Sequence, residues 1–228
     1  MIPIRDNIPA KRFPAMNWLI ILANLAVFIY QLTLNDSQLA SFFSKYGLIP
    51  NHYSSFTTDD LLSLKVFTVY PFITNIFIHG GWLHFIANMW VLIIFGDNVE
   101  NRMGSFRYLL FYMVCGLVAS GAHFALNMNS PVPAIGASGA IAGVMAAYMF
   151  LFPFAKVVLL VPILFIPLFF NVSAVIYIGL WFLIQLWNGG ILLSNIAPST
   201  NIAFFAHIGG FLSGVLLYNF FLSKRYRA

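Results

Sequence analysis

Residues 136–152 read GASGAIAGVMAAYMFLF, and residues 203–222 read AFFAHIGGFLSGVLLYNFFL. Both stretches are apolar and carry glycines at short intervals, which is typical of helices that pack closely in a membrane. Each also holds a polar side chain, Ser138 in the first and His207 in the second, that is costly in a lipid-facing helix. The two stretches therefore indicate membrane helices that enclose a hydroxyl and an imidazole for a chemical purpose.

The composition of the whole chain agrees with a membrane protein. Of its 228 residues, 61% are hydrophobic and only 7% are charged, whereas soluble domains carry about 25% charged residues. The net charge of +5 would suggest nucleic acid only if the basic residues clustered on one surface, but they lie at the ends of apolar segments. We therefore expect an all-α polytopic membrane protein that binds no nucleic acid.

The apolar segments predict six membrane-spanning helices in a single domain, residues 1–228. Several are shorter than the ~20 residues that a full crossing needs, which fits helices whose ends lie in a protein-lined, water-filled depression. The expected spans are Asn17–Leu34, Trp82–Phe95, Tyr108–Leu126, Ala137–Phe152, Ser173–Trp187 and Ala203–Leu222. Two further apolar regions are ambiguous. Leu61–Ile78 is read as a loop packed partly into the interface, and Val157–Phe170, with two prolines and several β-branched residues, as extended or re-entrant.

The basic residues predict the orientation of the chain. Only Lys45 and Lys65 lie on one side of the expected spans, and nine basic residues lie on the other. By the positive-inside rule the second side is cytoplasmic, so residues 1–16 and 223–228 form short cytoplasmic tails. The nine residues are Arg5, Lys11, Arg12, Arg102, Arg107, Lys156, Lys224, Arg225 and Arg227.

With this orientation, the second, fourth and sixth spans all enter from the external side. His84 and Asn88 lie in the first turns of the second span, Ser138 begins the fourth, and His207 lies about one turn into the sixth. Because each residue rises ~1.5 Å along a helix, all four polar groups lie near one depth. Three separate helices thus contribute polar groups to one layer, which indicates a site.

These residue types permit nucleophilic catalysis. A serine hydroxyl becomes reactive when a histidine takes its proton, as His207 could do for Ser138. Free backbone N–H groups at the start of a helix, and His84 and Asn88 at i, i+4 spacing on one face, can donate hydrogen bonds to an oxyanion. None of the six acids lies within a span near His207. We therefore expect a dyad whose imidazole is held by packing.

Small residues should let the helices that carry the dyad approach closely. On the fourth span they recur at i, i+4 intervals, and on the sixth span they share a face with His207. The residues expected to pack near the site are Gly136, Gly139, Gly143, Gly210 and Gly214.

Four motifs resemble those of the rhomboid family of intramembrane serine proteases. Residues 136–139 (GASG) are similar to its G-x-S-G motif, and residues 206–214 (AHIGGFLSG) to its A-H-x-x-G-x-x-x-G motif. Residues 84–88 (HFIAN) resemble H-x-x-x-N, with His79 where members often carry a second histidine, and residues 100–104 (ENRMG) resemble E-x-R-x-G. The motifs occur in order between His79 and Gly214, and together they are specific.

The resemblance implies a six-transmembrane-helix rhomboid-like bundle and an intramembrane serine endopeptidase. Ser138 would be the nucleophile and His207 the general base, with His84, Asn88 and the Ser138 backbone N–H as the oxyanion hole. The expected substrates are single-span transmembrane proteins, cleaved in or near the outer leaflet without a cofactor or metal. The expected setting is the lipid bilayer of a bacterial inner (plasma) membrane.

Two of the departures from the family pattern bear on the site. The first external loop lacks the Trp-Arg pair common in the family, and residues 64–66 (LKV) offer one basic residue there. Ala142 stands where some members have an aromatic ring under the histidine, so the orientation of His207 must come from elsewhere, with Phe204 and Phe211 as candidates.

Three other readings of the polar cluster remain. A catalytically silent rhomboid-like protein that binds membrane clients would usually have lost the serine or the histidine, and both are present here. A small transporter would be expected to show inverted repeats, and none is visible. A zinc protease needs clustered ligands such as H-E-x-x-H, whereas His79 and His84 are five residues apart with no nearby acid.

Overall fold

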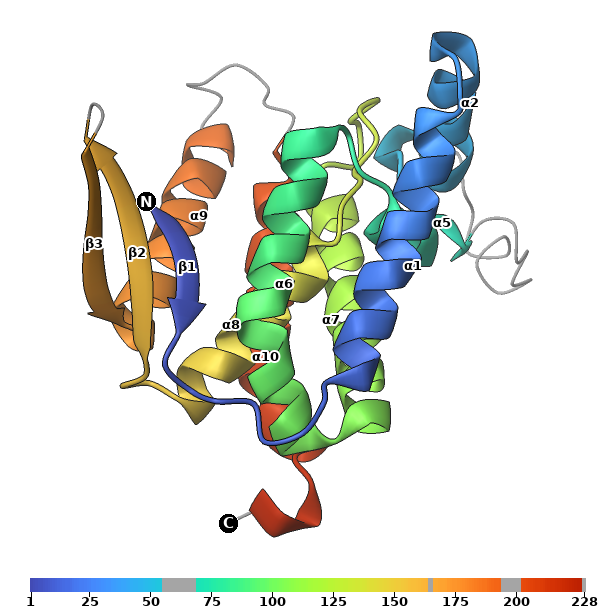
Figure 1. Ribbon diagram of the computed structural model, residues 1–228. Coiled ribbons are helices and arrows are strands. Elements are labelled where there is room, and N and C mark those ends of the chain that lie inside the picture. Colours follow the sequence, from blue (N-terminus) through green and yellow to red (C-terminus); the bar gives the residue numbers. More distant parts are fainter. Residues whose placement is uncertain (55–68, 164–165, 194–201, 227–228) are drawn as a thin grey trace.

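The computed structural model describes residues 1–54, 69–163, 166–193 and 202–226, and it shows a helical bundle with a small sheet at one side (Figure 1). Within these residues, five helices are long and apolar enough to cross a membrane, and a sixth apolar helix, α8, is shorter. The apolar segments of the sequence predicted six membrane helices, and this prediction is confirmed. The helices are α1 (Ala15–Leu32), α6 (Trp82–Met103), α7 (Ser105–Leu126), α8 (Ser138–Leu151), α9 (Ala174–Leu193) and α10 (Phe204–Phe221).

The short helix α8 forms the centre of the bundle. Every residue from Gly139 to Tyr148 is buried, and α8 packs against α6, α7, α9 and α10. A helix that is apolar on all sides must be buried by protein or lipid on all sides. Because α8 is covered by protein, it need not span the bilayer itself, and its first residue can lie below the membrane surface.

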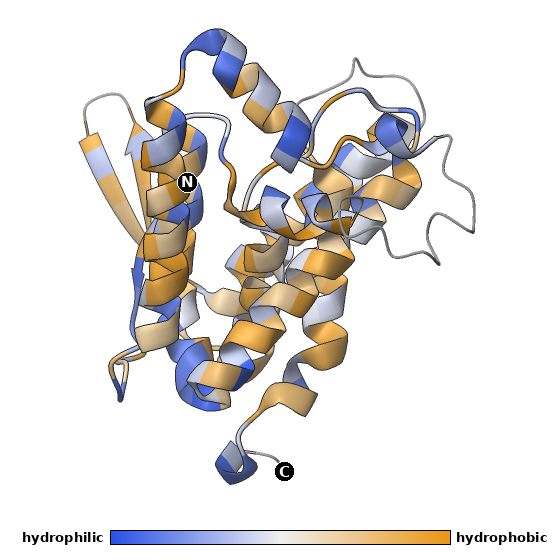
Figure 2. Cartoon of the chain, turned by 90° about the vertical axis from the view of Figure 1, so that its right-hand side faces the viewer, coloured by the Kyte–Doolittle hydropathy of each residue, from blue (hydrophilic) through white to orange (hydrophobic). Residues whose placement is uncertain are grey.

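The surface pattern is that of a membrane protein. Figure 2 shows hydrophobic residues along the lengths of the helices and hydrophilic residues concentrated near the two ends of the bundle. Large apolar side chains are exposed on the long helices, where lipid would cover them. Examples are Leu22, Ile29, Ile86, Ile93, Leu180, Leu183, Leu216 and Phe220.

At one end of the bundle, the Glu100 carboxylate holds the start of α1. It accepts hydrogen bonds from the backbone N–H groups of Met16 (3.1 Å) and Asn17 (2.8 Å). It also accepts one from the Ser105 hydroxyl (2.5 Å) at the start of α7. Because the first N–H groups of a helix have no partner within the helix, a carboxylate there stabilises it. Glu100 thus joins α1, α6 and α7.

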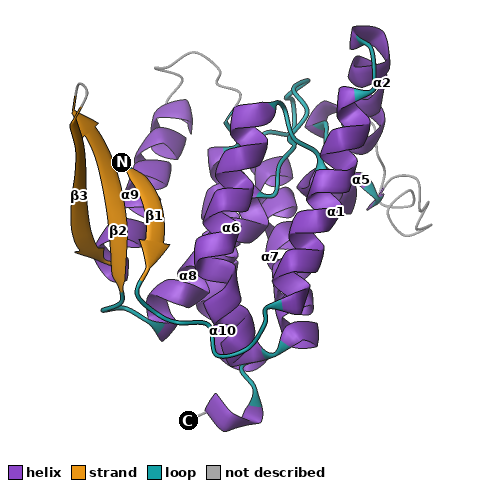
Figure 3. Cartoon of the chain, in the orientation of Figure 1, coloured by secondary structure: helices purple, strands orange, loops and turns teal. Residues whose placement is uncertain are grey.

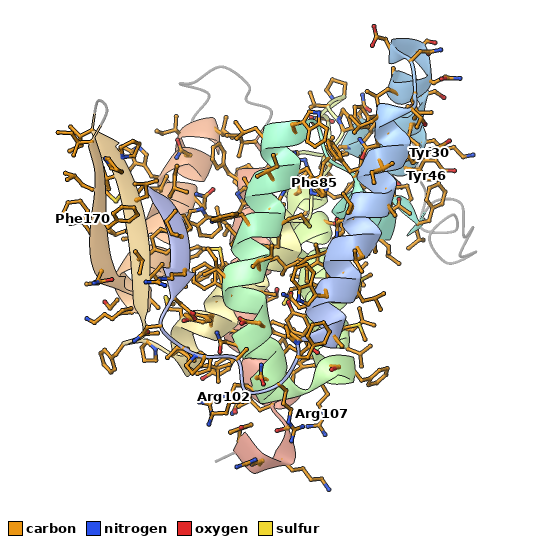
Figure 4. The ribbon with its side chains drawn as sticks, in the orientation of Figure 1. Tyr30, Tyr46, Phe85, Arg102, Arg107 and Phe170 are labelled. Atoms are coloured by element: carbon orange, nitrogen blue, oxygen red, sulfur yellow. The ribbon has the colours of Figure 1, made fainter. Side chains whose placement is uncertain are left out.

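Two arginines join the same end to the chain after α10 (Figure 4). The Arg102 guanidinium lies 4.8 Å from the ring centre of Phe152 and 4.5 Å from that of Tyr226. Arg107 donates a hydrogen bond of 2.7 Å to the Leu222 carbonyl. These contacts fix the ends of four helices relative to one another.

A three-stranded antiparallel sheet flanks the bundle beside α9 (Figure 3). Its strands are β1 (Ile2–Asp6), β2 (Lys156–Ile163) and β3 (Ile166–Ser173), in the order β1-β2-β3. Of the region Val157–Phe170, residues 157–163 and 166–170 are therefore extended, one of the two conformations that its prolines and β-branched residues favoured. Strand β1 lies within residues 1–16, which were expected to form a short tail. The fold is thus mostly helical, with this small sheet beside the bundle.

Short elements lie toward the other end of the bundle, with α2 at the top of Figure 1 and α5 lower, beside α1. Of the ambiguous region Leu61–Ile78, residues 61–68 lie outside the described residues. These include the LKV segment, residues 64–66. The remainder forms two short helical turns. The short elements are α2 (Asp36–Tyr46), η1 (Pro50–Tyr53), α5 (Pro71–Thr74) and η2 (Asn75–Phe77), and η3 (Lys224–Tyr226) lies at the opposite end.

Candidate active site

Ser138 and His207 meet where α8 and α10 begin. Ser138 is the first residue of α8, and His207 lies in the first turn of α10. Their side chains are joined by a hydrogen bond of 2.7 Å between Ser138 Oγ and His207 Nε2. This is the distance that a base needs to take the proton of a nucleophile. The structure thus brings together the two residues that the sequence motifs singled out.

Glycines allow the two helices to come this close. A Cβ atom added at Gly210 would overlap the backbone of Gly139, and one added at Gly214 would overlap the backbone of Gly143. The helix axes therefore approach at two levels, one turn apart, with no side chain between them. This contact holds Ser138 and His207 within hydrogen-bonding distance.

His84 lies beside the loop that leads into Ser138. The backbone N–H of Gly80 donates to His84 Nδ1 over 3.3 Å, so the neutral ring carries its proton on Nε2. Gly136 has a φ of 127°, and a Cβ there would lie 2.7 Å from both Cε1 and Nε2 of His84. Only glycine accepts this conformation and this contact. The Nε2–H donor thus faces the backbone just before the nucleophile.

Asn88 lies on α6 one turn beyond His84 and is buried. Its side-chain nitrogen Nδ2 is shielded from solvent and has no hydrogen-bond partner among the described residues. Buried donors are almost always paired, so one that is not calls for a reason. One such reason is that the amide donates a hydrogen bond only when negative charge develops on a bound substrate.

Helix α9 supplies an additional contact to the histidine. Gln185 is buried, and its Oε1 lies 2.9 Å from His207 Nδ1, on the opposite edge of the ring from Ser138. Gln185 stands in none of the sequence motifs, and packing alone was expected to hold the imidazole. The signal that could have found it is an amide side chain in an otherwise apolar span.

Aromatic rings also surround the imidazole. The Trp181 ring centre lies 5.7 Å from that of His207 at an interplanar angle of 39°, and the Phe204 ring meets it edge-on at 6.5 Å. Phe211, the other ring expected to orient the histidine, stacks instead on Phe182 at 3.9 Å. Of the two aromatic candidates, Phe204 therefore contacts His207 and Phe211 supports the surrounding rings.

A small cavity of about 20 Å³ adjoins Ser138. Its polar lining comes from Asn75, Ser120, His123 and Ser138, and Asn75 Nδ2 donates to the Ser120 hydroxyl over 3.0 Å. A cavity needs ≳10–15 Å³ and two or more polar partners to hold a water molecule. The size and lining of this cavity meet both requirements.

Comparison with known proteins places this chain in a family. Residues 66–225 match the model of the rhomboid domain, and they include all four motifs. The chain belongs to the rhomboid family. The expected family and a mostly helical, multi-pass membrane fold are therefore confirmed.

Named relatives of this rhomboid chain come from plants, bacteria and yeast. RHOMBOID-like protein 1 of Arabidopsis thaliana is 29% identical over 155 residues, which are 60% of this chain and 39% of that protein. Rhomboid protease GluP of Bacillus subtilis (strain 168) is 34% identical over 142 residues, 62% and 24% of the two chains. Mitochondrial Rhomboid protein 1 of Saccharomyces cerevisiae is 30% identical over 161 residues, 67% and 41%. The chain spans between about a quarter and a half of the length of the first relatives it matches.

His79, the second histidine of the rhomboid motif, lies behind the site. It is buried, its ring centre is 5.2 Å from that of His84, and its backbone exchanges two hydrogen bonds with the Gln31 side chain. Burial lowers the pKa of His79 to about 3, and repulsion from His84 whenever that ring is protonated acts in the same direction. A neutral His79 supports the ring of His84 without adding a charge.

In the described part of the chain, no group of three or more His, Cys, Asp or Glu could hold a metal ion.

Proposed function

We propose that this rhomboid-family chain is a serine endopeptidase that hydrolyses peptide bonds of membrane proteins. The observation that carries the proposal is the hydrogen bond of 2.7 Å between Ser138 Oγ and His207 Nε2. A serine in a membrane helix ordinarily donates to a backbone carbonyl, as Ser213 does to Gly210. Ser138 is instead paired with a base at the start of a helix.

The proposed reaction has two halves. In the first, Ser138 Oγ attacks the substrate carbonyl carbon while His207 Nε2 takes its proton. His207 then gives this proton to the leaving amine, and the C–N bond breaks to leave an acyl-enzyme. In the second half, His207 takes a proton from a water molecule that attacks the ester. The acid product leaves, and the proton returns to Ser138.

The oxyanion of each tetrahedral intermediate would be held by three donors. These are the Ser138 backbone N–H, His84 Nε2–H and Asn88 Nδ2. The first belongs to a helix N-terminus, the second is fixed as a donor by Gly80, and the third is a buried donor with no partner among the described residues. Such preorganised donors usually supply the largest single contribution to catalysis.

Two further features support hydrolysis within a membrane. The cavity beside Ser138 could hold the water that the second half-reaction consumes. Ser138 also lies at the end of α8 away from Arg102 and Arg107, near the external end by the proposed orientation. We infer that a single-span substrate enters at this level and unwinds locally, since a helical backbone shields its own amides.

The test uses the purified full chain in detergent with a model single-span transmembrane substrate. We expect cleavage by the wild type and its loss in Ser138→Ala and in His207→Ala. The double variant should be no worse than either single one, because members of one catalytic unit are not additive. Ser37→Ala, an exposed serine in α2, is the matched control and should cleave normally.

The outcomes separate the rival readings. Wild-type turnover by Ser138→Ala would refute the proposal. A wild type that binds the substrate and never cleaves it would favour the client-binding reading. Inactivation by EDTA that zinc reverses would favour a metalloprotease.

A further inference from the structure

This inference rests on the proposed hydrolase chemistry and concerns what holds the catalytic base. Gln185 comes from α9 and lies on the Nδ1 edge of His207, opposite the edge that binds Ser138. We propose that Gln185 is a positioning residue that fixes both the tautomer and the orientation of His207. It would take the place that a carboxylate has in a Ser-His-Asp triad.

The backbone of α9 determines which way the Gln185 amide points. Gln185 Nε2 donates to the carbonyl of Trp181, four residues earlier, over 3.2 Å. A carbonyl oxygen can only accept, so the NH₂ group must face Trp181 and the amide oxygen must face His207. Turning the amide over would set two oxygens against each other.

The amide then determines which nitrogen of His207 carries the proton. Because Oε1 of Gln185 can only accept, Nδ1 must be the protonated nitrogen. Nε2 is therefore left with its lone pair, which accepts the Ser138 hydroxyl proton over 2.7 Å. The other tautomer would place a proton between Nε2 and Ser138 and could not act as a base. A chain of three hydrogen bonds thus runs from the Trp181 carbonyl to Ser138.

A neutral amide suits this location better than an acid does. Gln185 is 6% exposed, and an ionised carboxylate at such a site in a membrane is costly. The amide offers the same acceptor oxygen without a charge. Trp181 lies on the same face of α9, one turn before Gln185, and its ring also packs against His207. Two contacts from α9 therefore set the position of the imidazole.

The first test removes the acceptor and keeps the volume of the side chain. In Gln185→Leu, we expect kcat on a transmembrane substrate to fall about 100-fold with KM nearly unchanged. Loss of the correct tautomer costs about 10⁴ in a soluble serine protease, and the loss here should be smaller because Trp181 and Phe204 still pack against the ring. The rate at which a fluorophosphonate labels Ser138 should fall in parallel.

The second test restores the acceptor. In Gln185→Glu, a protonated carboxyl group has a C=O that accepts from His207 and an O–H that donates to Trp181. We expect kcat within about tenfold of the wild type. Asn188→Leu is the matched control, since Asn188 is one turn further along α9 and makes the same type of bond to its own helix, to the Ile184 carbonyl. It should leave kcat unchanged.

A spectroscopic readout separates positioning from packing. In protein labelled with ¹⁵N only at its five histidines, the signals of His207 are those lost in His207→Asn. We expect them to show a proton on Nδ1 in the wild type and in Gln185→Glu. In Gln185→Leu they should shift toward a proton on Nε2, which free histidine prefers. A packing role would leave the tautomer unchanged.

Three results would overturn the inference: wild-type kcat in Gln185→Leu, equal losses in Gln185→Leu and Gln185→Glu, or an Nδ1 proton that persists in Gln185→Leu. If Gln185→Leu does not fold, Gln185→Met, which also lacks an acceptor, takes its place. Failure of the proposed function is seen separately, as a wild type whose Ser138 neither reacts with fluorophosphonate nor cleaves. The tautomer measurement still decides the role of Gln185 in that case.

Discussion

At the scale of single residues, the proposed reactivity of Ser138 depends on its position at the start of α8 as much as on the side chains around it. The first four N–H groups of a helix have no partner within it, so a serine that begins a helix brings a free donor next to its hydroxyl. Ser213, in the middle of α10, has no such donor and uses its hydroxyl to satisfy the Gly210 carbonyl. The same residue type is therefore structural in one helix and available for chemistry in another.

Loss of one proposed oxyanion donor should lower turnover without abolishing it. His84→Ala and Asn88→Ala each remove one donor and leave the Ser138 backbone N–H in place. Loss of one such donor costs on the order of 10²–10³ in turnover in a soluble protease. We expect the smaller loss for Asn88→Ala and a loss between that and Ser138→Ala for His84→Ala. Both should appear in kcat, because the charge exists only in the transition state.

Steady-state kinetics on one transmembrane substrate provides the measurement. His52→Ala removes an exposed histidine outside the site and should behave as the wild type does. If His84→Ala and Asn88→Ala raise KM and spare kcat, the two residues bind the substrate and do not hold the oxyanion.

Motifs predicted some of these residues and could not predict others. Ser138 and His207 stand in short patterns of small residues, so a linear sequence is enough to suggest that they meet. Gln185 stands in no pattern, and its contact with His207 depends on how α9 is rotated against α10. That rotation is set by tertiary packing, which the periodicity of a uniformly apolar helix does not encode.

At the scale of elements, the contact between α8 and α10 limits which side chains fit. Gly210→Ala would press a methyl group into the backbone of Gly139 and force the helices apart. Overpacking of this kind costs about 1–3 kcal/mol. Because the same contact joins Ser138 to His207, we expect both a lower unfolding temperature and a loss of turnover of at least about tenfold.

The matched control for this variant is Gly121→Ala on α7. A Cβ at Gly121 meets no atom within 4 Å. Alanine favours a helix over glycine by up to about 1 kcal/mol, so Gly121→Ala should be neutral or slightly stabilising. Equal unfolding temperatures and turnover for the two variants would show that the α8–α10 contact is less tight than the structure indicates.

Strand β1 is joined to the bundle by polar contacts that no pattern in the sequence indicates. Asp6 Oδ2 accepts hydrogen bonds from the Tyr148 hydroxyl and from Asn98 Nδ2. Trp90 Nε1 donates to the Pro3 carbonyl over 2.5 Å. A five-residue strand is too short to show a periodicity of its own, and its partner strand lies more than 150 residues away. Only the folded chain brings these groups together.

The carboxyl group of Asp6 should make stability depend on pH. Burial raises the pKa of Asp6 above its ordinary value of 3.8, although the hydrogen bond from Tyr148 acts in the opposite direction. The folded state therefore holds this proton more tightly than the unfolded state does. Its contribution is fully present below about pH 4 and is lost as the pH rises through the raised pKa.

The variant Asp6→Asn keeps an oxygen that accepts from Tyr148 and removes the ionisation. Between pH 4 and pH 7, we expect the unfolding temperature of the wild type to fall relative to that of Asp6→Asn. Asp36→Asn, at the exposed start of α2, is the control. Parallel curves for the wild type and Asp6→Asn would show that the carboxyl group titrates alike in the folded and unfolded states.

At the scale of the whole molecule, the two ends of the bundle differ in chemistry. The end that holds Arg102 and Arg107 is tied together by a buried glutamate and by arginine contacts with rings and a carbonyl. The opposite end holds the dyad and the short capping helices. The charge pattern of the sequence predicts that the first end is cytoplasmic, so the proposed substrate would be cleaved nearer the opposite side of the membrane.

This orientation can be tested with cysteine labelling, because the chain has a single cysteine, Cys115, which is fully buried in α7. Ala10→Cys introduces an exposed thiol on the N-terminal side, and Ser37→Cys introduces one on α2. Neither change alters the nine-to-two split of basic residues from which the orientation follows.

We expect a membrane-impermeant maleimide to label Ser37→Cys on intact cells and Ala10→Cys only after permeabilisation. The wild type, labelled in neither condition, is the background. Labelling of Ala10→Cys on intact cells would reverse the orientation and place Ser138 near the cytoplasmic leaflet, so that any substrate would have to be cleaved from that side.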